Sequence, residues 1–86
     1  MDDIRNIIEK MERNPGDIRF TEVCKVCESF FGTPRQSGSH VIYKMPWRGD
    51  PRINLQDDNG KAKAYQVRQV LRAIYTLEKK NENTKK

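Results

Sequence analysis

The chain has 86 residues, of which 35% are hydrophobic and 34% are charged. This length supports one domain with a modest core, and no apolar run approaches the ~20 residues of a membrane span. The first residues are acidic and lack the apolar stretch of a secretory signal, so we expect a cytoplasmic protein.

The first predicted element is a helix over residues 2–13. Its apolar side chains recur at the i, i+3, i+4, i+7 spacing of one helical face, and they are Ile4, Ile7, Ile8 and Met11. Pro15 and Gly16 then favour a turn. We therefore treat residues 1–16 as an N-terminal helix and turn, which either packs on the rest of the domain or serves as an arm for a partner.

A second helix is predicted over residues 20–31, because apolar residues line one face and Gly32 is a typical C-cap residue. It contains both cysteines of the chain, Cys24 and Cys27. A Cys-x-x-Cys pair occurs in redox sites and in zinc sites, but the chain has only one histidine to add to a zinc site. Positions i and i+3 share a helical face, so we interpret both thiols as core residues.

Three strands are predicted next, over residues 33–37, 40–45 and 52–56, with a glycine turn between the first two. The strand over 52–56 has the clearest alternation of polar and apolar residues, which predicts that Ile53 and Leu55 face inward. Residues 46–51 form a loop with two prolines.

A second turn begins at Asp57 and Asp58, which we prefer to a metal site because neighbouring side chains in a turn diverge. The last helix is predicted over residues 64–78, and residues 79–86 form a polar tail that we expect to be disordered. This order of elements predicts an α+β domain with helices on one face of an antiparallel sheet.

The net charge of +5 is unevenly placed along the chain. Residues 1–31 hold seven acidic and five basic residues, a net charge of −2, whereas residues 32–78 hold eight basic and four acidic residues, a net charge of +4. A basic surface attracts phosphate backbones. A nucleic-acid partner is therefore plausible for the second part of the chain.

The single histidine, His40, follows the glycine turn and opens the second predicted strand. Histidine exchanges protons near neutral pH, as general acid–base catalysis requires. A histidine and several cations are the types of side chain that metal-free cleavage of RNA needs. In this reaction the ribose 2′-hydroxyl attacks its own phosphate. The cations that we select are Arg35, Lys44, Lys61 and Lys63.

Two aromatic side chains near His40, Tyr43 and Trp47, are candidates for stacking on bases. Tyr43 fits the core equally well, and Trp47 fits an anchor for its loop. Strand alternation places His40 on the same face as Ile42 and Lys44. Both faces of this strand carry an apolar residue, so the pattern leaves open which face meets the helices.

A resemblance to the HicA family of bacterial toxins rests on several segments. They are Gly38-Ser39-His40-Val41-Ile42-Tyr43, a short strand, Gly60-Lys61, and a helix reading Tyr65-Gln66-Val67-Arg68-Gln69-Val70-Leu71. The segment Arg19-Phe20-Thr21-Glu22-Val23-Cys24-Lys25-Val26 and the pair Phe31-Gly32 are similar to the family's first core helix. The resemblance covers about residues 18–77, and we define a HicA-like domain over residues 17–78.

The resemblance implies a double-stranded-RNA-binding-like fold of helix, three strands and helix, to which this chain adds an N-terminal helix. It implies a metal-independent endoribonuclease that cleaves mRNA and inhibits translation as the toxin of a type II toxin–antitoxin pair. His40 would be catalytic, a HicB-like antitoxin would cover the site, and no cofactor is expected. Many members carry a polar residue where this chain has Val41.

We predict substrate contacts from residues around the histidine and from the later Gly-Lys segment. They are Arg35, Gly38, Ser39, Lys44, Lys61 and Lys63. Two other functions remain open at this point. The same fold can bind RNA without cleaving it, and the basic face can instead contact an acidic protein partner.

Overall fold

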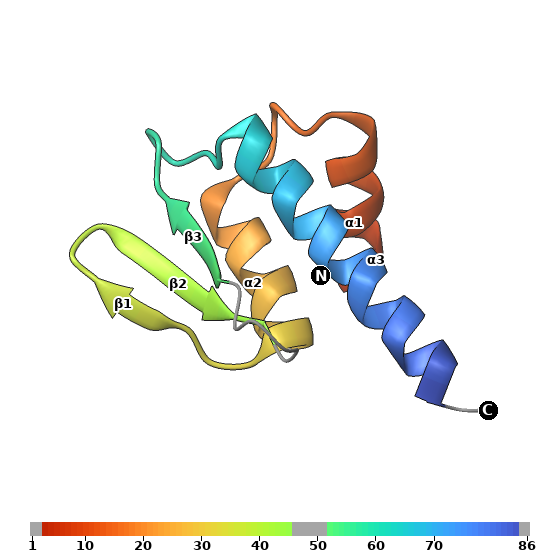
Figure 1. Cartoon of the computed structure of the whole chain (residues 1–86). Helices are drawn as coiled ribbons and strands as arrows, with labels where there is room; N and C mark the ends of the chain where they lie inside the picture. Colours follow the sequence, from red (N-terminus) through yellow and green to blue (C-terminus); the bar gives the residue numbers. More distant parts are fainter. Residues whose placement is uncertain (1–2, 46–51, 85–86) are drawn as a thin grey trace.

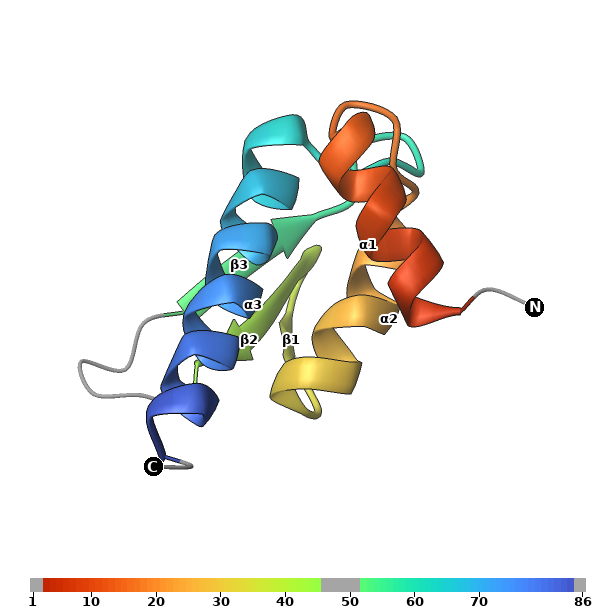
Figure 2. The ribbon, with the colours of Figure 1, turned by 90° about the vertical axis from the view of Figure 1, so that its right-hand side faces the viewer.

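The computed structural model describes residues 3–45 and 52–84, which form three helices and a three-stranded antiparallel sheet (Figure 1). The helices are α1 (Ile4–Arg13), α2 (Phe20–Phe31) and α3 (Ala64–Thr84). The strands are β1 (Arg35–Ser37), β2 (His40–Lys44) and β3 (Arg52–Gln56), in the sheet order β1-β2-β3. The helices lie on one side of the sheet (Figure 2), so the predicted α+β class is confirmed.

The N-terminal helix is part of the domain, because α1 packs on both α2 and α3. Ile7 and Met11 of α1 are buried in the same core as the inner face of the sheet. The Lys10 ammonium lies 2.9 Å from the Glu22 carboxylate, which joins α1 to the first turn of α2. The helix begins after Asp3, whose carboxylate accepts a hydrogen bond from the Arg5 backbone at 3.4 Å.

The register of the sheet decides which face of β2 meets the helices. Val41 pairs with Leu55 and Tyr43 pairs with Ile53, and these residues face the core. Tyr43 is only 1% exposed, and its hydroxyl donates a hydrogen bond to the Cys24 carbonyl of α2 at 3.2 Å. His40 alternates with these residues and therefore lies on the outer face of the sheet, away from the helices.

Four predicted boundaries differ from the structure. The first helix begins at Ile4 and not at residue 2, and β2 ends at Lys44 and not at residue 45. β1 begins at Arg35 and not at residue 33, because Pro34 has no backbone N–H to donate to a ladder. α3 continues to Thr84 and does not end near Glu78, so residues 79–84 of the predicted tail are helical. These residues contain neither glycine nor proline, so nothing in the sequence stops the helix. The predicted loop over 46–51 lies outside the described residues.

No helix in the described part of the chain combines the length and the apolar composition needed to cross a membrane.

Candidate functional site

His40 is presented on the outer face of the sheet by a tight hairpin. Ser37 pairs with His40, so Gly38 and Ser39 alone form the connection between β1 and β2. Gly38 has a φ of 61°, which favours glycine at the first central position of such a turn. The turn therefore fixes where β2 begins and places His40 at its first residue.

A hydrogen bond to Asn54 of β3 orients the His40 ring. Nδ1 of His40 lies 2.8 Å from Oδ1 of Asn54. An amide oxygen can only accept a hydrogen bond, so Nδ1 donates this bond. In the neutral ring the lone pair is then on Nε2, which is the nitrogen that can take a proton from a substrate.

A hollow of about 270 Å³ adjoins His40 where the outer face of β3 meets α3. Its lining consists mostly of amide side chains, with one aromatic and one guanidinium group: His40, Arg52, Asn54, Gln56, Tyr65, Gln66 and Gln69. Tyr65 is 60% exposed, one of two exposed large hydrophobic residues among those described. This hollow thus combines a proton-exchanging group, hydrogen-bonding amides and an accessible ring.

Gln66 joins α3 to the edge of β3 and is only 4% exposed. Its Nε2 donates a hydrogen bond to the Asn54 carbonyl at 3.0 Å, and its Oε1 accepts one from the Gln56 backbone at 3.3 Å. Gln66 therefore has a structural role in the hollow, because its amide satisfies backbone groups that the edge strand would otherwise leave unpaired.

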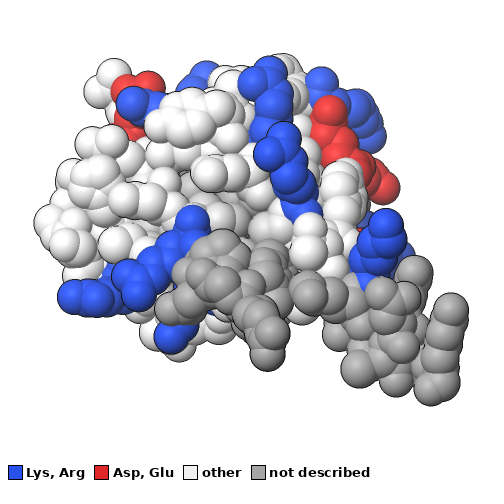
Figure 3. All heavy atoms as spheres, in the orientation of Figure 1, with Lys and Arg blue, Asp and Glu red and all other residues white. Residues whose placement is uncertain are grey.

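A second hollow of about 300 Å³ lies on the same outer face and is basic. Its lining consists of Thr33, Pro34, Arg35, Ile42, Lys44 and Arg52. Figure 3 shows Lys and Arg atoms beside the β1–β2 hairpin and along α3. Because Arg52 lines both hollows, the basic surface is continuous with the surroundings of His40.

The predicted contact residues divide into two groups in space. Arg35 and Lys44 lie on the outer face with His40, whereas Lys61 and Lys63 line neither hollow of that face. The Lys61 ammonium lies 2.7 Å from the Asp17 carboxylate, and this contact lowers the pKa of Asp17. The Lys63 carbonyl accepts hydrogen bonds from the first turn of α3. The sequence predicts contacts from these lysines because of their charge and because Gly60-Lys61 is part of the family resemblance.

Of the two aromatic candidates for stacking, Tyr43 is excluded by its burial beneath the sheet, and Trp47 lies outside the described residues. The sequence interpretation did not select Tyr65, Gln69, Asn54 or Gln56. The alternation in residues 52–56 gave a usable signal, because it placed Asn54 and Gln56 on the outward face of their strand. An exposed tyrosine near a helix start carries no comparable signal.

The two cysteines lie on the side of α2 that faces the core, as predicted. Cys27 is buried, Cys24 is partly buried, and both are free thiols. Burial raises the pKa of each thiol, which makes the reactive thiolate scarce. Among the residues that the structure describes, no group of three or more His, Cys, Asp or Glu side chains could hold a metal ion.

The turn predicted at Asp57 is also confirmed. The Gly60 backbone donates a hydrogen bond to Oδ1 of Asp57 at 2.6 Å, and Asp58 pairs with Lys61 in a short bridge. Asn59 and Gly60 both have positive φ angles, of 55° and 88°. The Asp57 carboxylate thus accepts a backbone hydrogen bond within the turn.

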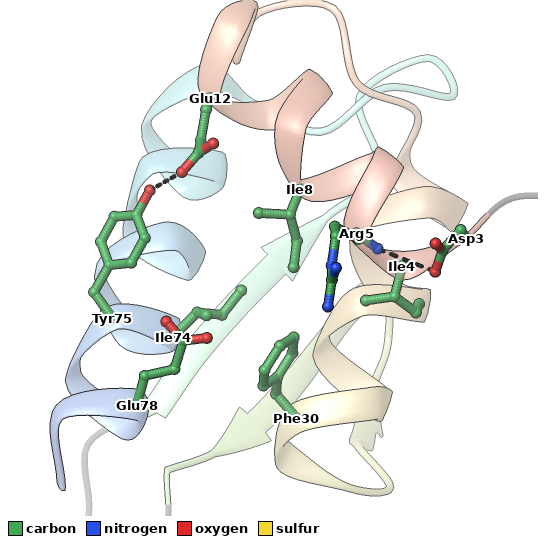
Figure 4. Close-up of a pocket in the computed structure, with 9 residues that line it drawn as sticks. All are labelled: Asp3, Ile4, Arg5, Ile8, Glu12, Phe30, Ile74, Tyr75 and Glu78. Atoms are coloured by element: carbon green, nitrogen blue, oxygen red, sulfur yellow. Dashed lines mark hydrogen bonds between the residues drawn. The ribbon is translucent and has the colours of Figure 1, made fainter. Parts of the chain in front are cut away.

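A third hollow, of about 380 Å³, lies among the helices and has the opposite charge (Figure 4). Its apolar side chains are Ile4, Ile8, Phe30 and Ile74, and its charged side chains are Asp3, Arg5, Glu12 and Glu78. The hydroxyl of Tyr75 donates a hydrogen bond to Glu12 across it. Its carboxylates disfavour phosphate groups, so the outer face of the sheet is the better candidate for nucleic acid.

Comparison with known proteins finds no family model that matches the chain, and neither a curated protein nor a solved structure matches it. Function is therefore inferred from the residues of the site and from the sequence resemblance.

Proposed function

We propose that this protein is a HicA-like toxin, a metal-independent endoribonuclease that binds mRNA on the outer face of its sheet and cleaves it with His40. The position of His40 carries this proposal. It lies on the outer face of the sheet, its ring is held by Asn54 at 2.8 Å, and a basic surface adjoins it. The succession of α2, three strands and α3 agrees with the double-stranded-RNA-binding-like arrangement that the resemblance implies.

The chemistry assigned to His40 is transfer of the ribose 2′-hydroxyl proton to Nε2. The 2′-oxygen then forms a bond to the adjacent phosphorus while the bond from phosphorus to the 5′-oxygen breaks. The leaving 5′-oxygen takes up a proton from water, His40 then releases its proton to solvent, and the products are a 2′,3′-cyclic phosphate and a 5′-hydroxyl. Arg35, Lys44 and Arg52 stabilise the negative charge that develops on the phosphate.

In this proposal the protein acts in the cytoplasm on mRNA and so inhibits translation. A HicB-like antitoxin is the expected protein partner, and it would cover the outer face around His40. A basic surface attracts a partner of opposite charge and speeds its association. Binding of RNA and binding of the antitoxin would then compete for the same residues.

A second candidate function, RNA binding without cleavage, is favoured by one observation. Of the side chains that line the hollow beside His40, the others are amides, a phenol and a guanidinium. Cleavage requires one proton to be removed and one to be delivered, and His40 is the one lining group suited to either transfer near neutral pH. A module that only binds RNA would need no second group.

The test uses purified wild-type protein, His40→Ala and the exposed α2 variant Ser29→Ala, each incubated with single-stranded RNA in excess EDTA. Wild type and Ser29→Ala should cleave at the same rate. His40→Ala should be slower by roughly 10²- to 10⁴-fold, the usual contribution of a general acid or base, and should still bind RNA. Expression in bacteria should arrest growth with wild type and not with His40→Ala.

Other results would contradict the proposal in distinct ways. Equal cleavage by wild type and His40→Ala would show that His40 is not catalytic. Salt-dependent binding by both proteins with intact RNA would support the binding module. Absence of RNA binding even at low salt would favour a domain that contacts proteins.

A further inference from the structure

The hollow beside His40 differs in chemistry from the basic surface next to it. Three of its lining side chains, Asn54, Gln56 and Gln69, are amides that lie at or near the surface. Backbone phosphates are bound mainly by cations, whereas amides both donate and accept hydrogen bonds. The hollow is therefore better suited to a neutral polar group than to another phosphate.

Tyr65 adds a flat apolar surface to this set. It is 60% exposed at the start of α3, although burying such a ring would be favourable. Proteins that bind single-stranded RNA stack unpaired bases on exposed aromatic rings and contact the base edges with polar side chains. Tyr65 and Gln69 are one helical turn apart, so both project from the same side of α3.

The position of these groups is fixed by the core. Gln66, which lies between Tyr65 and Gln69 in the chain, is buried and hydrogen-bonds to the backbone of Asn54 and Gln56. α3 therefore cannot shift along β3 without breaking two hydrogen bonds. The start of α3, from which Tyr65 projects, is therefore held at a fixed position against the amides of β3, which lowers the cost of bringing these groups together on binding.

We propose that this hollow is a subsite for one unpaired base of the RNA, with Tyr65 stacking on the base and Gln69 contacting its edge. The proposal rests on the proposed function only in taking RNA as the ligand. The volume of about 270 Å³ lies just below the ~300–1,000 Å³ of sites for drug-sized ligands, which suits a single base. The amide matches the N7 acceptor and N6 donor of adenine, so adenine is the expected base.

The test measures binding of dye-labelled oligonucleotides by fluorescence anisotropy. The probes are 2′-O-methyl oligoadenylate, 2′-O-methyl oligouridylate and a 2′-O-methyl ribose-phosphate chain of equal length without bases. None of them can be cleaved through a 2′-hydroxyl, and all carry the same charge. The affinity of the wild-type protein should be highest for oligoadenylate, lower for oligouridylate and lowest for the base-free chain.

Tyr65→Ala should weaken binding of oligoadenylate by roughly 5- to 150-fold, the range for loss of one aromatic stack. It should also bring the affinity close to that for the base-free chain. Tyr65→Phe should retain the wild-type affinity, and Gln69→Ala should reduce the preference for adenylate over uridylate. Tyr75→Ala is the matched control, because Tyr75 is also exposed on α3 but lines the acidic hollow.

Unchanged oligoadenylate affinity in Tyr65→Ala, or an equal loss in Tyr75→Ala, would overturn the base subsite. If His40-dependent cleavage were found together with that result, the nuclease would stand and the subsite alone would be wrong. A specific loss in Tyr65→Ala without any cleavage by wild type would support the subsite and contradict the nuclease. Failure of wild type to bind any probe at low salt would refute both.

Discussion

His40 depends on Asn54 for the direction of its ring. A histidine at a strand start can rotate about two side-chain bonds, and the bond from Nδ1 to the Asn54 amide removes most of that freedom. A carboxylate in the same place would add negative charge beside the ring and beside the phosphate of the proposed RNA substrate. The neutral amide fixes the ring without repelling phosphate, which suits a site that binds a polyanion.

The thiols provide a prediction at the residue scale. We expect Cys27 to react with a thiol reagent such as dithiobis-nitrobenzoate far more slowly in the folded protein than in guanidinium chloride at the same pH. Its pKa is raised by burial, which disfavours the thiolate, and the side chain is shielded from solvent. The measurement is the absorbance of the released thiolate, with Cys27→Ser identifying the contribution of Cys24.

Cys24 should react faster than Cys27, since it is only partly buried. Immediate release of two equivalents from the folded protein would contradict the interpretation of Cys24 and Cys27 as core residues.

Single residues could be predicted from the sequence only where the pattern was decisive. Cys24 and Cys27 share a helical face, so their place in the core was predictable. The sheet face that carries His40 was not predictable, because Ile42 and Tyr43 lie on opposite faces of β2 and are both apolar. Only the packing of Tyr43 against α2 shows which of the two faces is buried. Val41, where a polar residue is common in the family that the sequence resembles, pairs with Leu55 and faces the core.

At the scale of elements, the contact between α3 and β3 depends on Gln66. We expect Gln66→Ala to lower the free energy of unfolding by about 1–3 kcal/mol, because it leaves the Gln56 N–H and the Asn54 carbonyl without their partner. Urea denaturation followed by circular dichroism measures this change. Gln69→Ala removes the same side chain from an exposed position of α3 and should change the stability by less than about 0.5 kcal/mol.

Equal stability of Gln66→Ala and Gln69→Ala would show that the edge of β3 does not need the amide.

The elements themselves were mostly predictable, because α1, α2 and β3 each have a clear hydrophobic period and a clear stop. Residues 52–56 were predicted as a strand and form β3. The end of α3 is not predictable from composition, because the polar residues 79–84 suggest a disordered tail but include no residue that stops a helix. The pairing of Gln66 with β3 depends on two elements coming together, so no local pattern could indicate it.

For the whole molecule, charge is divided between two surfaces. The outer face of the sheet holds Arg35, Lys44 and Arg52, whereas the hollow among the helices holds three carboxylates, Asp3, Glu12 and Glu78, and one cation, Arg5. A polyanion is therefore attracted more strongly to the outer face of the sheet than to the hollow among the helices.

This separation predicts how salt affects RNA binding. Arg35→Ala should reduce the slope of log affinity against log salt concentration by about 0.7, the value for one contact to a single-stranded backbone. Arg13→Ala on α1, which removes the same charge from an exposed position away from the sheet, should leave the slope unchanged. Binding titrations with a labelled single-stranded RNA at several salt concentrations give both values. Equal slopes for the two variants would place the RNA elsewhere.

The two hydrogen bonds from Gln66 to the backbone of β3 also affect how the protein can assemble with other chains. The Gln66 amide bonds to β3 through one donor and one acceptor, as a neighbouring peptide backbone would, so the Gln56 N–H and the Asn54 carbonyl are already paired and cannot pair with a further strand. In the described part of the chain, β1 pairs with β2 alone, and it is only a short, exposed strand. Growth of the sheet into a polymer requires two open edges, and in this molecule Gln66 occupies part of one of them.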